Sequence, residues 1–103
     1  MKSDDKYLWT KHSQYKMKRY GLSPQRIKRI IRHPARTEEA IVPEMIASMQ
    51  PAGGKHYSEI WTIYKFSQKS KNINIITAWR YPGKSPARNP IPQEILEEIK
   101  SII

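Results

Sequence analysis

The sequence contains no cysteine. This absence excludes disulfide bonds, and it removes the thiolate both as a zinc ligand and as a catalytic nucleophile. The three histidines, His12, His33 and His56, are too scattered to form a metal-binding motif. We therefore expect a protein without a metal site and without a cofactor.

Long hydrophobic runs are also missing. No window approaches the roughly 18 apolar residues that a membrane span needs, and the charged N-terminus lacks the apolar segment of a secretory signal. We therefore expect a cytoplasmic protein with no membrane partner. The length of 103 residues fits one domain over residues 1–103.

Acidic residues are scarce in the first third of the chain. Residues 1–36 hold 11 Lys and Arg against 2 Asp, which accounts for nine of the ten net positive charges, whereas residues 37–103 hold 8 against 7. A molecule that is basic at one end is suited to a polyanion. The composition therefore predicts RNA or another nucleic acid as the partner.

The basic segment is predicted to form a pair of helices over residues 10–33. The first helix is expected from Thr10 to Tyr20, because Gly21 can adopt the left-handed conformation that ends helices. Its apolar stripe contains Trp9, Met17 and Tyr20.

The second helix has a well-marked start. Ser23 is a suitable N-cap and Pro24 suits the first helical position, whereas His33 before Pro34 marks the end. Its core positions are Ile27, Ile30 and Ile31.

Residues 37–81 change to a strand pattern. Segments 40–42 and 45–49 are predicted strand pieces interrupted at Pro43, and segments 58–66 and 73–81 are rich in β-branched and aromatic residues. The polar residues 67–72 fit a hairpin loop. Alternation in the last strand places Ile73, Ile75, Thr77 and Trp79 on a core face and Arg80 on the open face.

The last part of the chain is predicted to be a loop followed by a helix. Residues 82–92 contain four prolines, which favours a loop over 82–91. Residues 92–103 carry the apolar stripe Ile95, Leu96, Ile99, Ile102 and Ile103. This stripe either packs on the body or docks a partner. The neighbouring Glu94, Glu97 and Glu98 can neutralise a basic site in the same chain or in another.

These elements predict an α+β fold. Two N-terminal helices pack on a three- or four-stranded antiparallel sheet, with helices on one face of the sheet and an added C-terminal helix.

One face of the first helix is a candidate phosphate site. His12, Lys16 and Arg19 are spaced i, i+4 and i+7, so they share one side of a helix with 3.6 residues per turn. The cluster combines fixed positive charge with a group that titrates near neutral pH.

Residues 10–34 resemble an uncharacterised prokaryotic domain family of the RelE-like clan. That family opens with a histidine, an Arg-Met pair and a glycine, which correspond here to His12, Lys16-Met17 and Gly21. Residues 75–80 are similar to the closing strand of BrnT-type toxins. The resemblance implies the BECR fold of ribonuclease toxins, a helical pair against a four-stranded antiparallel sheet. Ser13 and Lys16 depart from the family's usual Ala and Arg, and Lys lacks the bidentate phosphate contact of Arg.

This resemblance implies a metal-independent endoribonuclease. His12 would act as base or acid, and Arg19 and Arg80 would stabilise the charge that develops on phosphorus. Tyr64 and Thr77 would orient the substrate. The residues expected to contact nucleic acid are Lys11, Lys16, Arg26, Arg29, Tyr81 and Arg88.

Two other functions are consistent with the sequence. The first is a nucleic-acid-binding module without catalysis, in which the basic helices hold the phosphate backbone. The second is a protein that binds an antitoxin, or a second copy of itself, through residues 92–103.

Overall fold

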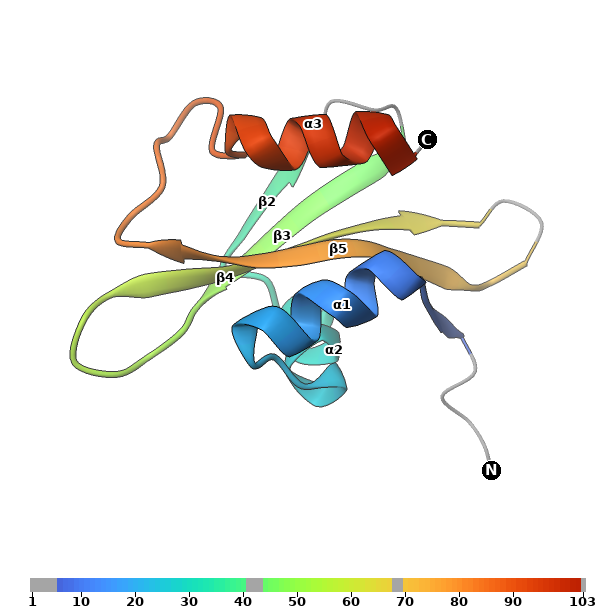
Figure 1. The fold of residues 1–103 in the computed structure, drawn as a ribbon. Coiled ribbons are helices and arrows are strands. Elements are labelled where there is room, and N and C mark those ends of the chain that lie inside the picture. Colours follow the sequence, from blue (N-terminus) through green and yellow to red (C-terminus); the bar gives the residue numbers. More distant parts are fainter. Residues whose placement is uncertain (1–5, 41–43, 68–69, 103) are drawn as a thin grey trace.

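The computed structural model describes residues 6–40, 44–67 and 70–102. Within these ranges the chain forms three helices and one five-stranded sheet (Figure 1). The strand order is β1-β5-β4-β3-β2, with β1 parallel to β5 and the other neighbours antiparallel. The elements are β1 (Tyr7–Trp9), α1 (Lys11–Tyr20), α2 (Pro24–Arg32), β2 (Arg36–Glu39), β3 (Met45–Pro51), β4 (Ser58–Phe66), β5 (Ile73–Pro82) and α3 (Gln93–Ile102).

The sheet differs from the predicted one, although the α+β class is as expected. The prediction of three or four antiparallel strands missed β1, which makes the sheet mixed. Trp9 belongs to this strand and not to the first helix. The strand predicted from Ala40 is also displaced, because β2 ends at Glu39, and residues 41–42 lie outside the described residues.

Helices cover both faces of the sheet, so the prediction of helices on one face was wrong. Figure 1 shows α3 on one side and α1 with α2 on the other. Both faces need cover because the central strand β4 is buried without interruption from Glu59 to Tyr64. The core between the sheet and the α1–α2 pair contains Tyr7, Met17, Leu22, Ile27, Ile30, Ile60, Tyr64, Ile73, Ile75 and Ala78. The core on the side of α3 contains Ala40, Met45, Ala47, Met49, Trp61, Ile63, Ile76, Trp79, Ile91, Ile95 and Ile99.

A β-bulge in β5 changes which side chains share a face. Ile63 pairs with Thr77 and the next residue, Tyr64, pairs with Ile75, so Ile76 is the extra residue. Ile75 therefore lies in the core under α1 and α2, whereas Trp79 lies in the core under α3. The prediction that the two share a face was wrong, because strict alternation assumes an uninterrupted ladder.

The local signals for the two N-terminal helices are confirmed. Gly21 ends α1 with φ 67°, in the left-handed region. Ser23 Oγ accepts a hydrogen bond from the Arg26 amide at 3.1 Å, and Pro24 opens α2. The helix ends at Arg32, directly before the predicted stop.

The Pro-rich segment is a loop, as expected, and α3 packs on the sheet. Ile95 and Ile99 are buried there, whereas Ile102 is 41% exposed. The indole rings of Trp61 and Trp79 stack beneath the helix with their centroids 5.8 Å apart. Across the part of the chain that the structure describes, no helix is long and apolar enough to cross a membrane.

Candidate nucleic-acid interface

Helix α1 lies along β5 and is attached to it near both ends. At the first end, Thr10 Oγ1 donates a hydrogen bond to the Ile75 carbonyl at 2.8 Å and accepts one from the Ser13 amide at 3.0 Å. At the other end, Arg80 Nη2 donates to the Tyr20 carbonyl at 3.2 Å. Because β1 pairs only with Ile73–Ile75, α1 covers a stretch of β5 that lacks a strand neighbour on this side.

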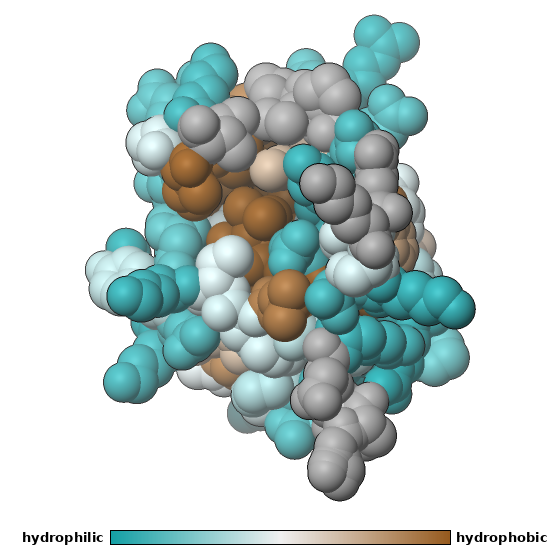
Figure 2. Space-filling model, turned by 90° about the vertical axis from the view of Figure 1, so that its right-hand side faces the viewer, coloured by the Kyte–Doolittle hydropathy of each residue, from teal (hydrophilic) through white to brown (hydrophobic). Residues whose placement is uncertain are grey.

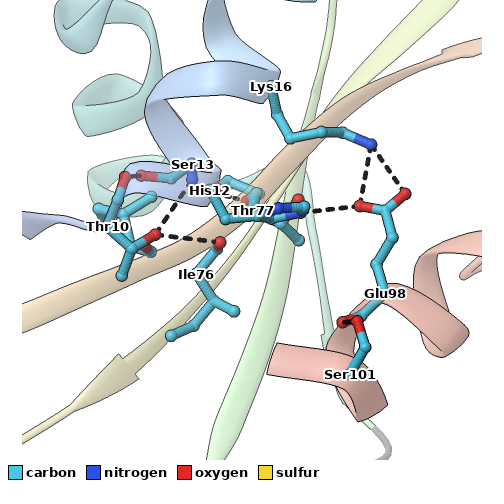
Figure 3. Close-up of polar contacts among 10 residues, drawn as sticks. Thr10, His12, Ser13, Lys16, Ile76, Thr77, Glu98 and Ser101 are labelled. Atoms are coloured by element: carbon cyan, nitrogen blue, oxygen red, sulfur yellow. Dashed lines mark hydrogen bonds and ion pairs between the residues drawn. The ribbon is translucent and has the colours of Figure 1, made fainter. Parts of the chain in front are cut away.

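His12 and Lys16, two of the predicted site residues, contact a carboxylate from the C-terminal helix. Glu98 of α3 lies 2.8 Å from His12 Nε2, and both of its oxygens accept hydrogen bonds from Lys16 Nζ at 3.0 Å (Figure 3). Lys16 is only 3% exposed, so this carboxylate compensates a buried charge. The expected neutralisation of a basic site by a C-terminal glutamate therefore occurs within the chain, through Glu98.

The two residues predicted to orient substrate are buried in the sheet. The Thr77 hydroxyl is buried and has no hydrogen-bond partner among the described residues. The Tyr64 hydroxyl lies 3.1 Å from Ser48 Oγ in the interior, where it has a structural partner. The Tyr64 hydroxyl is therefore occupied by a structural contact, and neither residue is exposed to a ligand.

A second cluster of predicted residues lies at the turn between the two helices. Arg26, Arg29 and Arg80 line a pocket of about 290 Å³, together with the turn Gly21–Ser23, Ala52 and Ile60. No acidic side chain is among the described residues that line it. Arg26 Nη2 donates to the Pro51 carbonyl at 2.9 Å, which fixes its guanidinium at the pocket wall.

The electrostatics of this pocket favour an anion. Burial lowers the pKa of Arg26, and the positive charges of Arg29 and Arg80 lower it further. The Arg26 Nε group is buried and has no partner in the described structure. An anion in the pocket would relieve the repulsion between the three guanidinium groups.

The predicted catalytic residues do not form one site. His12 is in the first turn of α1, whereas Arg80 contacts Tyr20 at the last residue, about 12 Å further along the helix axis. Arg19 is exposed and its guanidinium lies over the Tyr20 ring, 5.6 Å from the centroid. His12 thus groups with Lys16, and Arg80 groups with Arg26 and Arg29.

The remaining predicted nucleic-acid contacts are spread over the surface. Lys11 is exposed at the start of α1, and Arg88 is exposed in the Pro-rich loop. Tyr81 is half-buried and packs against the core under α3. On the side where the start of α1 meets the end of α3, Figure 2 shows hydrophobic residues in the middle of the face and hydrophilic residues around them.

No protein-family model, curated protein or solved structure matches the chain. Among the residues described, no group of three or more His, Asp or Glu side chains is placed to hold a metal ion.

Sequence reasoning missed a buried acidic network that holds the Pro-rich loop. Glu59 is 1% exposed and accepts hydrogen bonds from Trp61 Nε1, the Tyr57 hydroxyl and both the amide and the hydroxyl of Ser85. Arg36 donates to Ser85 Oγ at 3.0 Å and to two carbonyls of the loop. The available signal was a lone carboxylate within an otherwise apolar and aromatic strand.

Proposed function

We propose that the protein binds nucleic acid, with RNA as the preferred ligand, through the basic layer formed by α1 and α2. The charge of this layer supports the proposal. Helices α1 and α2 together contain eight Lys and Arg and no Asp or Glu. RNA is the nucleic acid that the resemblance to RelE-like toxins favours.

Carboxylates elsewhere in the fold leave much of this charge available. Glu98 pairs with Lys16, and Glu38 pairs with Arg36. Five other cations are exposed and have no carboxylate partner among the described residues: Lys11, Lys18, Arg19, Arg29 and Arg32. Such a surface gains affinity for a phosphate backbone by releasing condensed counterions.

Binding of a single-stranded RNA should therefore weaken steeply with salt. We expect the slope of log K against log salt to become shallower by about 0.7 for each phosphate contact that is removed. The measurement is fluorescence anisotropy over a salt series with the wild type, Lys18→Ala and Arg19→Ala. Lys100→Ala is the matched control, because Lys100 is exposed on α3 on the other face of the sheet.

Two results would contradict this function. One is an affinity that barely changes with salt, since backbone binding releases counterions. The other is a slope reduced equally by Lys100→Ala and by the α1 substitutions, because the basic layer would then have no special role.

A second candidate function is metal-independent RNA cleavage at His12. It is favoured by the hydrogen bond to Glu98, because a carboxylate partner fixes the ring orientation of a catalytic histidine. In this reaction His12 would remove the proton from a 2′-hydroxyl, whose oxygen attacks the adjacent phosphorus. The bond between phosphorus and the 5′-oxygen breaks, and the leaving oxygen takes a proton from water. The products are a 2′,3′-cyclic phosphate and a strand with a 5′-hydroxyl.

The test is incubation with end-labelled RNA, free and ribosome-bound, in the presence of a chelator. We expect cyclic phosphate ends from the wild type and none from His12→Ala. Because Arg80 lies at the other end of α1, Arg80→Ala should weaken RNA binding more than it slows cleavage of bound RNA. Cleavage that is unchanged by His12→Ala would contradict His12 as the catalytic residue. RNA binding without any cleavage would contradict the second candidate function and support the first.

A further inference from the structure

Three arginine side chains line the small pocket at the α1–α2 turn. Arg26 and Arg29 come from α2, and Arg80 comes from β5. We propose that these three residues bind a phosphate monoester, the group found at a phosphorylated end of a nucleic-acid strand. This inference rests on the proposed binding of nucleic acid by α1 and α2, and it adds a site for the strand end.

Two of the guanidinium groups are held in place before any ligand binds. Arg26 Nη2 is fixed by the Pro51 carbonyl, and Arg80 Nη2 is fixed by the Tyr20 carbonyl. Each bond uses one of the five N–H donors of its side chain. Each guanidinium therefore keeps further Nη–H donors for an anion, whereas Arg26 Nε is buried and has no partner in the described structure. Arg29 is exposed and also lines the pocket, so its guanidinium is accessible to a ligand.

The surrounding backbone adds to the attraction for an anion. Ser23, the N-cap of α2, lines the pocket, so the positive end of the helix dipole lies beside the three side chains. The dipole alone does not define a site. Here it acts in the same direction as the guanidinium groups.

The charge of the pocket favours a monoester over an internal phosphate. A phosphodiester carries one negative charge, whereas a monoester carries about −1.5 to −2 at pH 7 and presents three terminal oxygens. Three cations that repel one another are better compensated by the higher charge, and three oxygens match three donor groups. The layer of α1 and α2 would hold the rest of the strand through its backbone.

The first experiment compares one oligoribonucleotide in three forms, with a 5′-phosphate, with a 3′-phosphate or with hydroxyls at both ends. We expect one phosphorylated form to bind about tenfold more tightly than the hydroxyl form. Arg29→Ala and Arg80→Ala should remove this preference, and Arg29→Lys should restore only part of it, because lysine lacks the forked contact. Arg32→Ala, also exposed on α2 but outside the pocket, should weaken all three forms equally and keep the preference.

The second experiment tests the pocket without RNA. Methyl phosphate, a monoester, and dimethyl phosphate, a diester, are titrated while the Arg26 Nε–H resonance is followed by NMR. The proposal predicts a shift at lower concentrations of methyl phosphate, which is lost in Arg29→Ala while the rest of the spectrum stays folded.

The outcomes separate the two proposals. Salt-sensitive RNA binding with equal affinity for all three forms overturns the monoester site and leaves nucleic-acid binding intact. Absence of RNA binding together with a selective methyl phosphate shift supports the pocket and contradicts the proposed function. Equal response to the two small phosphates, or no response to either, overturns the pocket.

Discussion

Glu59 illustrates what a single buried charge requires in this protein. Burial alone would raise the pKa of its carboxyl, but hydrogen bonds from Ser85, Tyr57 and Trp61 outweigh that effect and lower the pKa. The same bonds attach the Pro-rich loop to β4. Ionisation of one residue is thus linked to the position of a segment 26 residues later in the sequence.

The folded protein should therefore lose stability in acid through Glu59. A lowered pKa means that ionised Glu59 stabilises the fold above its unfolded pKa, about 4.3, and that this contribution disappears as the pH falls through the folded pKa. We expect Glu59→Gln to be less stable near pH 7 and to show a weaker acid dependence. Urea unfolding of both proteins, measured from pH 7 down to acid pH, gives the stability and its dependence on pH.

The control for this prediction is Glu97→Gln, since Glu97 is an exposed glutamate on α3. Ser85→Ala keeps the carboxylate and removes one donor, so it should cost about 1–2 kcal/mol near neutral pH. An acid dependence that is the same in wild type and Glu59→Gln would contradict the assignment.

Lys16 and Glu98 should behave as a coupled pair. Glu98→Gln leaves the buried ammonium without its carboxylate, and we expect a loss of about 2 kcal/mol in unfolding free energy. Adding Lys16→Met removes the stranded charge, so the double variant should be more stable than the sum of the single effects predicts. A double-mutant cycle by urea unfolding tests this, and strictly additive effects would show that the ion pair contributes nothing of its own.

The elements differ in how far the sequence alone predicts them. Helix ends depend on neighbours within a few residues, so Gly21 and the Ser23-Pro24 pair were sufficient to place α1 and α2. The bulge at Ile76 and the strand β1 depend on partners in distant parts of the chain. No local pattern specifies them, and the prediction that Ile75 and Trp79 share a face was wrong as a result.

In the candidate site too, the sequence predicted the features that depend on local spacing and not those that depend on distant contacts. The i, i+4 spacing correctly placed His12 and Lys16 on one face of α1, because helical spacing is local. The grouping of Arg80 with Arg26 and Arg29 required the packing of β5 against the helix pair. It also separated Arg80 from His12, with which the resemblance had combined it.

The attachment of α1 to β5 should depend on the hydroxyl of Thr10. This group caps the helix and also bonds the β5 carbonyls at the bulge. We expect Thr10→Ala to lower the unfolding free energy by about 1–2 kcal/mol and to speed amide exchange in the first turn of α1. Thr10→Ser keeps the hydroxyl and is the control, and an equal loss in both variants would rule out the cap and the strand contact as the cause.

At the scale of the whole molecule, α1 and α2 carry eight Lys and Arg, whereas α3, from Gln93 to Ile102, contains three Glu and one Lys. The two layers lie on different faces of the sheet and meet where Lys16 of α1 pairs with Glu98 of α3. A polyanion that follows the positive potential should therefore approach from one side. The proposed binding of nucleic acid would therefore have a defined orientation.

Lysine modification can test that orientation directly. RNA should protect exposed Lys11 and Lys18 from acylation, whereas exposed Lys84 and Lys100 should react equally with and without RNA. The degree of modification at each lysine is measured by mass spectrometry after a short exposure to the reagent. Equal protection of all four lysines would contradict binding through one layer, and repetition at high salt should abolish the protection.

The parallel pairing of β1 with β5 has a consequence for the order of folding. Tyr7 pairs with Ile73, and Thr10 bonds a carbonyl 65 residues further along the chain. During synthesis the first strand and helix leave the ribosome long before the strand that holds them exists. Closing so long a loop is a slow, non-local step, so the antiparallel strands can pair with one another before the N-terminal segment is fixed. We therefore expect β1 and α1 to reach their native positions after β4 and β5 have paired.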